Sequence, residues 1–245
     1  MFEVMYAPSD DLTLMAMLPF IRKSMDHVTR TGVKFTTESE GIGDFQVKAL
    51  YTFYRVGFDR HRLIFIPGVS FPTGPIDEKD DTPAGPDQKL PYPMQVGSGT
   101  FDLLPGISYL GETDRWAWGV DAMATVRLAE NSNDYTLGNQ YELSGRLGWK
   151  WTDWLSPSIK IDAKIWENID GADPDLNPAV VPTADPDRRG GERVDLLFGI
   201  SLYVPRGDLK GLRFAIEGGV PIYQSLDGPQ LETDWLLTVG AQYVF

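Results

Sequence analysis

Apolar and polar residues alternate with a period of two along most of the chain, in segments of about ten residues. In Ser158–Ile165 the odd-numbered positions carry isoleucine or alanine, and the even-numbered positions carry lysine, aspartate or serine. Tyr141–Trp151, Leu212–Tyr223 and Leu231–Phe245 repeat this pattern. Such alternation is typical of β-strands with one apolar and one polar face, and it predicts an all-β protein.

Eleven such segments follow one another, and short and long connections alternate between them. The segments begin near Phe2, Leu12, Gly41, Arg62, Gly97, Trp116, Leu137, Ser156, Arg193, Gly211 and Leu231. The short connections are Pro8–Asp11, Phe58–His61, Gly111–Arg115, Thr152–Leu155 and Pro205–Lys210. The longer ones are Val28–Glu40, Gly74–Val96, Glu130–Thr136, Glu167–Glu192 and Ser225–Gln230. Because outer-membrane barrels have short periplasmic turns and longer outer loops, residues 1–245 are predicted to form one transmembrane antiparallel up-and-down β-barrel.

Aromatic residues gather near the short connections and the C-terminus, as in Tyr6, Tyr51, Phe53, Tyr54, Phe58, Tyr109, Trp116, Trp118, Trp149, Trp151, Trp154, Tyr243 and Phe245. This clustering predicts an aromatic girdle at one membrane interface. The alternative is the general preference of aromatic residues for strands. A terminal phenylalanine that closes an alternating strand also resembles the C-terminal signature of bacterial outer-membrane barrels.

The number of visible segments is odd, whereas bacterial single-chain barrels have an even number of strands and both ends in the periplasm. If the last strand runs down to the periplasm, counting back through eleven strands places Met1 on the outer side. We therefore expect a further strand to precede Met1 in the native protein, for about 12 strands in all. Direct pairing between the first strand and the strand that ends at Phe245 would contradict this expectation.

Composition narrows the function classes. The chain has 22 Lys and Arg against 35 Asp and Glu, a net charge of −13, which argues against a nucleic-acid binder. It has no cysteine and only two histidines, so it offers no disulfide or thiolate site, and no metal or cofactor is expected. The longest apolar stretch, Leu12–Ile21, is too short for a transmembrane helix.

The polar face of the strands is assigned to the lumen, where it supplies a nearly balanced set of charges. The basic candidates are Lys48, Arg127, Arg146, Lys150, Lys160, Lys164, Arg193 and Arg213. The acidic candidates are Glu3, Asp44, Asp102, Asp121, Glu142, Asp162, Asp195, Glu217 and Asp234. In one interpretation these charges pair across neighbouring strands. In the other, a basic ladder selects anionic solutes, with Arg146, Lys150, Lys160, Lys164, Arg193 and Arg213 as its members.

The negative charge is concentrated in the long loops. Glu167–Glu192 holds seven acids and two arginines, and the proline-rich Gly74–Val96 holds five acids and two lysines. Long loops are usually functional or disordered, so one of them could constrict the barrel, or both could be mobile tails. Pro19, Pro67, Pro72, Pro105 and Pro221 interrupt strand segments and predict bulges or kinks, with a lateral opening in the wall as the functional alternative.

Four segments resemble a family of outer-membrane proteins linked with the meta-pathway of phenol degradation in Gram-negative bacteria. They read MYAPSDDLTLMAMLPF, FTTESEGIGDFQVKALYTF, IPGVSFPTG and GSGTFDLLPGISYLG, and they occur in that order within Met5–Gly111. The resemblance implies a monomeric channel of roughly twelve strands for small hydrophobic or aromatic molecules. The family's first strand has no counterpart in the sequence, in agreement with the odd strand count.

These observations predict a passive diffusion channel in the outer membrane of a Gram-negative bacterium, with membrane lipids and small solutes as its partners. One alternative is a plugged structural or adhesive barrel whose outer loops carry the function. Another is an outer-membrane hydrolase that uses His27 with Asp26 and Ser24 nearby. A strand places His27 on the face opposite Asp26 and Ser24, so these three residues do not form a local triad.

Overall fold

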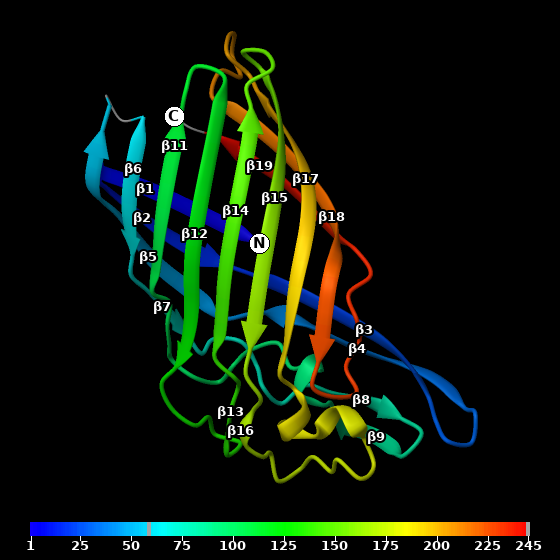
Figure 1. Ribbon diagram of the computed structural model, residues 1–245. Coiled ribbons are helices and arrows are strands. Elements are labelled where there is room, and N and C mark those ends of the chain that lie inside the picture. The colour runs from blue at the N-terminus through cyan, green and yellow to red at the C-terminus, as the bar shows by residue number, and fades with distance from the viewer. Residues whose placement is uncertain (58–59, 244–245) are drawn as a thin grey trace.

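The computed structural model describes residues 1–57 and 60–243. Its main sheet has thirteen strands, and eleven of them follow the chain in an antiparallel up-and-down order (Figure 1). These eleven are β1 (Phe2–Ser9), β2 (Leu12–Leu18), β5 (Phe45–Val56), β6 (His61–Ile66), β11 (Gly106–Glu112), β12 (Trp116–Arg127), β14 (Gln140–Trp149), β15 (Leu155–Trp166), β17 (Gly191–Tyr203), β18 (Leu212–Leu226) and β19 (Leu236–Tyr243). The predicted all-β class and strand order are therefore confirmed.

The two edges of this sheet are β1 and β19. Within the described residues, β1 pairs only with β2 and β19 pairs only with β18. Because eleven antiparallel strands lie in sequence order, the two edge strands run in the same direction. The contradicting observation, direct pairing of the first and last strands, is thus not found among these residues, and the expected additional strand stays a prediction.

Proline breaks the wall strands where the sequence predicted. Pro19 separates β2 from β3 (Phe20–Val28), and Pro67 separates β6 from β7 (Gly68–Phe71). Pro105 likewise separates β10 (Asp102–Leu103) from β11. The carbonyl oxygens of Pro67 and Pro105 still accept hydrogen bonds from Ala49 and Ala124 at 2.9 Å. Because these bonds bridge neighbouring strands, the wall bends at Pro67 and Pro105 without separating.

The long connections have far more structure than loops or tails. Most of Val28–Glu40 belongs to a hairpin arm of β3 and β4 (Lys34–Ile42), which extends beyond the main sheet (Figure 1). Gly74–Val96 contains β8 (Lys79–Thr82), β9 (Gly85–Lys89) and the 3-10 turn η1 (Tyr92–Met94). Elsewhere, β13 (Tyr135–Thr136) pairs with β16 (Asp170–Gly171), followed by η2 (Pro182–Ala184) and η3 (Pro186–Arg188).

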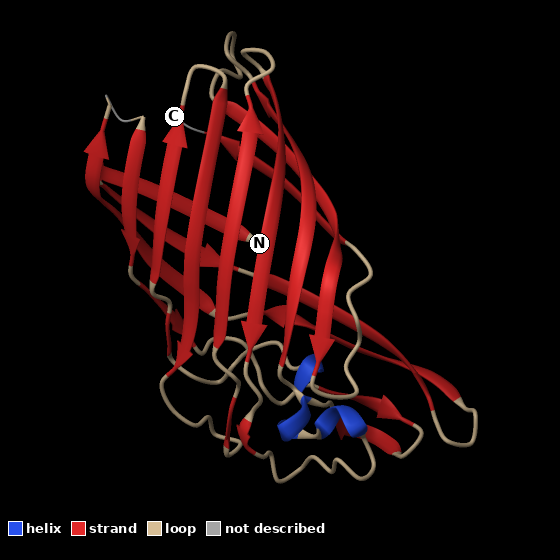
Figure 2. Ribbon diagram, in the orientation of Figure 1, coloured by secondary structure: helices blue, strands red, loops and turns tan. Residues whose placement is uncertain are grey.

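Figure 2 shows that the three short helical turns lie together at the end of the sheet where the long connections gather. We call residues 74–101, 128–139 and 167–190 the loop cap. At the opposite end, the rings of Trp116, Trp149 and Trp151 form a stacked row with centroids 6.0 and 5.8 Å apart. Their exposure matches the predicted aromatic girdle. Phe58 and Phe245, two further predicted members, lie outside the described residues.

The predicted segments near Gly41, Gly97, Leu137 and Leu231 start before their wall strands, which begin at Phe45, Gly106, Gln140 and Leu236. The last strand begins at Leu236 and not at Leu231, so Asp234 lies in an irregular segment and its assignment to the polar face of a strand is wrong. Around Pro221, Asp195 pairs with Pro221 and Val194 with Tyr223, which leaves one extra residue in β18. This bulge turns Tyr223 to the outer face, where its hydroxyl donates to Glu192 at 2.6 Å, although simple alternation grouped it with the polar face.

Candidate functional site on the inner wall

The two faces of the sheet differ sharply in chemistry. One face exposes a continuous set of apolar side chains, including Leu143 (56% exposed), Ile161 (50%) and Phe198 (61%). The other carries the charges, and Asp162 and Asp195 on it are buried. This is the reverse of a soluble sheet, in which apolar side chains pack inward and polar ones face water. The charged face is therefore the inner wall of the sheet.

Six charged residues lie close together on three adjacent strands and form two ion-paired groups, which together we call the charge network: Glu142, Lys160, Asp162, Lys164, Arg193 and Asp195. The Lys164 ammonium lies 3.3 Å from both Glu142 and Asp162. The Lys160 ammonium lies 3.4 Å from Asp162, and Arg193 Nε lies 3.0 Å from Asp195. Three cations thus offset three anions, and the network is neutral as a whole.

Strand register brings these groups together. Glu142 lies opposite Lys164, and Lys164 lies opposite Arg193. Two residues away along the same strands, Asp162 lies opposite Asp195. Directly opposed side chains on one face of a sheet lie about 4.5–5.5 Å apart at Cβ. Asp121, in the same row as Asp162, accepts hydrogen bonds from Ser108 at 2.5 Å and Ser144 at 3.4 Å. A row that holds Asp121, Asp162 and Asp195 therefore lies next to the row that holds Lys164 and Arg193.

The remaining members of the predicted basic ladder also have partners. Arg146 lies 3.4 Å from Glu217, and Lys150 lies 2.8 Å from Glu112. The Arg213 guanidinium lies over the Tyr203 ring at 5.4 Å. Because each ladder cation has a partner, the geometry matches the pairing interpretation, and lumen lining by these residues stays a prediction.

Several acidic candidates lie away from the charge network. Asp102 is buried beside Arg127, to which it is ion-paired, and Thr100 donates to it at 2.6 Å. This pair joins β10 to β12 inside the wall. Glu3 is exposed on the edge strand β1.

Asp44 lies at a junction of three of the sequence motifs, between β4 and β5. Its carboxylate accepts the backbone N–H of Gly74 at 2.9 Å and that of Ser98 at 2.8 Å. The Thr73 hydroxyl donates to the Gly43 carbonyl at 2.9 Å and accepts from the Phe45 N–H at 2.8 Å. GIGD, PTG and GSG thus meet at one point, which we call the motif junction, and Asp44 anchors the start and the end of the long Gly74–Val96 segment.

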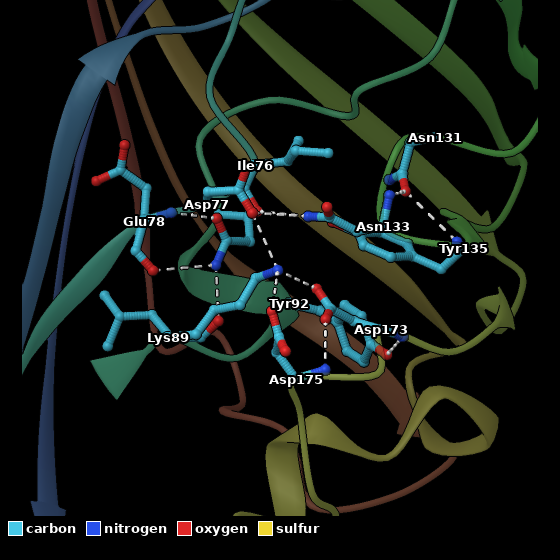
Figure 3. Close-up of polar contacts among 12 residues, drawn as sticks. Ile76, Asp77, Glu78, Lys89, Tyr92, Asn131, Asn133, Tyr135, Asp173 and Asp175 are labelled. Carbon is cyan, nitrogen blue, oxygen red and sulfur yellow. Dashed lines mark hydrogen bonds and ion pairs between the residues drawn. The ribbon is translucent and has the colours of Figure 1, made fainter. Parts of the chain in front are cut away.

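The sequence missed the residue that ties the loop cap together. Lys89, which is 8% exposed, lies 2.6 Å from Asp173 and 3.0 Å from Asp77, with Asp175 at 3.7 Å (Figure 3). Burial opposes the charge of Lys89, but the hydrogen bonds to Asp173 and Asp77 outweigh it and raise the pKa of this lysine. In turn, the side-chain hydrogen bonds from Lys89 and Asn133 lower the pKa of Asp77.

Beneath this lysine lies a small apolar core of Tyr92, Tyr135 and Ile169. The rings of Tyr92 and Tyr135 meet edge to face, with centroids 4.9 Å apart, and the Tyr92 hydroxyl accepts the Asp173 N–H at 3.0 Å (Figure 3). Burial raises the pKa of Tyr135 to about 12. Two acidic stretches that the sequence presented as loops or tails therefore pack on each other around a shared core.

The hairpin arm also holds the loop cap. The Lys23 ammonium donates to the carbonyls of Pro93 at 2.8 Å and Gln95 at 2.5 Å, and the Ser39 hydroxyl donates to Met94 at 2.6 Å. On the same arm, His27 Nε2 lies 2.9 Å from the Thr37 hydroxyl, and its ring stacks on Phe35. Asp26 instead accepts from Thr36, so alternation separates His27 from Asp26 as predicted.

A hollow of about 320 Å³ lies beside the charge network, and Met123, Glu142, Lys164, Trp166 and Arg193 are among its lining residues. A second hollow of about 490 Å³ lies at the base of the loop cap, between Arg127 and Asp170. Among residues 1–57 and 60–243, no group of three or more His, Asp or Glu is placed to hold a metal ion. In the same residues, no helix is long and apolar enough to cross a membrane.

Comparison with known proteins gave a matching family and similar solved structures. The model of a family described as putative MetA-pathway of phenol degradation matches residues 4–162. No curated protein sequence gives a significant match. The crystal structure of an outer membrane channel from Pseudomonas putida F1 superposes with a TM-score of 0.66 at 14% identity, over 98% of this chain and 79% of that one. At this identity the likeness concerns the fold, which is that of an outer-membrane channel barrel.

Proposed function

The chain belongs to the family described as putative MetA-pathway of phenol degradation, and from this premise we propose that it is an outer-membrane channel for passive uptake of small molecules. Residues 1–245 act as one barrel domain in the outer membrane of a Gram-negative bacterium. Its partners are membrane lipids and small solutes, and it works as a monomer without a cofactor or catalysis.

One observation carries this proposal: the sheet exposes apolar side chains on its outer face and keeps paired charges on its inner face. Lipid is the solvent that favours this arrangement, because an exposed band of leucine, isoleucine and phenylalanine would otherwise face water. Charged side chains on the other face are compatible with a water-filled lumen. The likeness of the fold to an outer membrane channel supports the same conclusion.

The solutes that fit best are small aromatic compounds. The family description points to phenol degradation, a process that requires aromatic molecules to enter the cell. The hollow of about 320 Å³ beside the charge network has Trp166 and Met123 next to charged groups. Apolar surface with a few polar groups suits a ring that carries a polar substituent. Transport needs no energy source in this proposal, because the solute moves down its own gradient.

Single-channel recording in a planar bilayer tests the proposal, with benzoate and phenol added in turn to the wild-type protein. We expect small, steady openings that these compounds partly block, because a solute inside a narrow lumen obstructs the ions. The same experiment with glucose controls for effects of added solute in general. Protein that is folded, as judged by heat-modifiable mobility on a gel, and that floats with lipid vesicles but passes no current would contradict the channel.

A second candidate, a plugged barrel with functional outer loops, is favoured by the order of the loop cap. Its buried core and the contacts of Lys89 would hold the outer end shut. Replacing residues 168–190 with a short Gly-Ser turn separates the two candidates. Under the channel proposal current persists or grows. Under the plugged-barrel candidate current appears only after the replacement, and the wild-type protein is silent.

A further inference from the structure

The inward cations of the wall are not equivalent. Of the eight basic residues assigned to the polar face, seven have an ion pair or a ring contact with a named partner. For the eighth, Lys48, the described structure records no ion pair and no hydrogen bond. Lys48 therefore keeps a charge that its surroundings do not neutralise by direct contact.

Lys48 is directed into the lumen by its strand and by a glycine beside it. Its neighbour Val47 is on the outer face, so Lys48 on β5 points inward. In register it lies between Met15 on β2 and Gly68 on β7. A Cβ on Gly68 would come within 2.7 Å of Lys48 Cγ and 3.1 Å of Leu104 Cβ. The lysine stem thus lies across Gly68, along the inner surface of the wall.

The acids whose charges act on this ammonium are Glu142 and Glu3, and the described residues show no ion pair between Lys48 and either of them. Glu142 lies on β14, four strands further along the sheet than β5, and it is already ion-paired with Lys164 at 3.3 Å. Glu3 is exposed on the edge strand β1. The same Glu142 lines the hollow of about 320 Å³.

We propose that Lys48 is the specificity-determining residue of the lumen and that it favours solutes with an anionic group, such as aromatic carboxylates. This inference rests on the proposed channel function. The fields of closely paired opposite charges largely cancel at the distance of a passing solute, whereas an unpaired charge acts on it directly. Channels commonly select ions through charged side chains that line the path of the ions.

The expected change in ion permeation follows from the distance between the passing ion and the Lys48 ammonium. A unit charge that an ion passes at about 6 Å in water-like surroundings changes its permeation by about threefold, and more where water is excluded. Salt shortens the reach of the charge to about 10 Å at 0.1 M. The effect of Lys48 should therefore grow as the salt concentration falls, whereas a change of lumen shape would not depend on salt in this way.

The test compares reversal potentials of the wild type and Lys48→Met in a KCl gradient at low salt. We expect the ratio of chloride to potassium permeability to fall about tenfold in Lys48→Met, because removing the charge changes the permeation of each ion about threefold and in opposite directions. Lys48→Arg should keep the wild-type ratio because it keeps the charge. Lys79→Met is the matched control: it removes the same charge from an exposed position on the loop cap. Block by benzoate, but not by phenol, should weaken in Lys48→Met.

Each outcome has a distinct meaning. A conducting wild type and Lys48→Met with equal permeability ratios and equal benzoate block would overturn the role of Lys48 and leave the channel intact. A wild type that inserts but passes no current would overturn the channel, and the role of Lys48 with it. If Lys48→Met does not give the heat-modifiable folded form, Lys48→Gln replaces it and the same comparison decides.

Discussion

Gly74 and Gly97 pass each other so closely that a Cβ on Gly74 would lie 2.7 Å from the Gly97 Cα. Neither residue has room for a side chain, because the obstructing atoms belong to the backbone of the other. This contact lies at the motif junction, next to the carboxylate of Asp44. The contact brings together the two ends of the Gly74–Val96 segment of the loop cap, although the two glycines lie 23 positions apart in the sequence.

Gly97→Ala should therefore destabilise the folded protein, by about 1–3 kcal/mol or more because the backbone must shift to admit a methyl group. Urea titration of the heat-modifiable gel band measures the change. Gly145→Ala is the control for adding a methyl group, since a Cβ at Gly145 on β14 meets nothing within 4 Å. Equal stability of the two variants would contradict a close contact between Gly74 and Gly97.

Asp44→Asn tests the anchor itself. The carboxylate accepts two backbone N–H groups, whereas an amide presents an NH₂ group to one of them. Loss of a charge-assisted bond at a half-buried site should cost about 1.5–3 kcal/mol. We expect faster cleavage of residues 74–97 by added protease, with the barrel band unchanged. Asp10→Asn, in an exposed turn, should leave the cleavage rate as in the wild type.

The strands could be predicted from the sequence because period-two alternation is local and each wall strand follows its predecessor in space. The bulge at Pro221 was also predictable, but its consequence was not: one extra residue reverses the faces beyond it, which is why Tyr223 faces outward with Glu192. In the same way, alternation predicted an inward position for Asp44 but could not reveal that Gly74 and Ser98 donate hydrogen bonds to it.

The loop cap was beyond sequence reasoning for a different reason. Lys89 and Asp173 lie 84 positions apart in acidic stretches whose composition is that of solvated loops. No periodicity marks Tyr92, Tyr135 and Ile169 as a core, because each comes from a different connection. One signal was present: glycines in three separate motifs indicate close approach of backbones, and they mark the motif junction.

Lys89→Met should loosen the loop cap. The substitution leaves the buried carboxylate of Asp173 without its ammonium partner, and an unpaired buried charge is strongly destabilising. We expect larger or more frequent openings in planar bilayers, together with faster proteolysis of residues 167–190. Lys79→Met, on the neighbouring strand β8, serves as the control. Unchanged conductance and proteolysis in Lys89→Met would mean that Lys89 does not hold the cap.

The contact between Lys89 and Asp77 also predicts a pH window for the cap. The pKa of Asp77 is lowered in the folded state. Asp77 therefore stabilises the cap fully above its ordinary pKa of 3.8, and this stabilisation is lost as pH falls through the lowered pKa. The pKa of Lys89 is raised, so Lys89 stabilises the cap fully below its ordinary pKa of 10.5. This stabilisation is lost as pH rises through the raised pKa. Proteolysis of the cap should be slow between these limits and faster outside them. In Lys89→Met the acceleration of proteolysis at acid pH should begin at a higher pH, nearer the ordinary pKa of an aspartate.

Asp162→Asn should change both stability and selectivity. Asp162 is the shared partner of Lys160 and Lys164, at 3.4 and 3.3 Å. Without its charge the network gains one net positive charge, so the chloride-to-potassium permeability ratio should rise, opposite to the change expected for Lys48→Met. Breaking such a buried pair costs about 3–5 kcal/mol, less here because Lys164 is partly exposed. Reversal potentials and urea titration measure the two effects, and an unchanged ratio would show that the network does not face the ion path.

The outer face supplies the last prediction. Ile161, 50% exposed in the middle of β15, faces outward between the inward residues Lys160 and Asp162. If lipid covers this face, Ile161→Arg should destabilise the barrel by about 2–4 kcal/mol, because a charge at the bilayer midplane loses its hydration. Trp151→Arg, at the short-turn end, should cost only about 0–1 kcal/mol because the interface is hydrated. Urea titration in lipid vesicles gives both values. If water covered the outer face instead, an exposed arginine at position 161 would be tolerated as well as one at position 151, and the difference between the two variants would vanish.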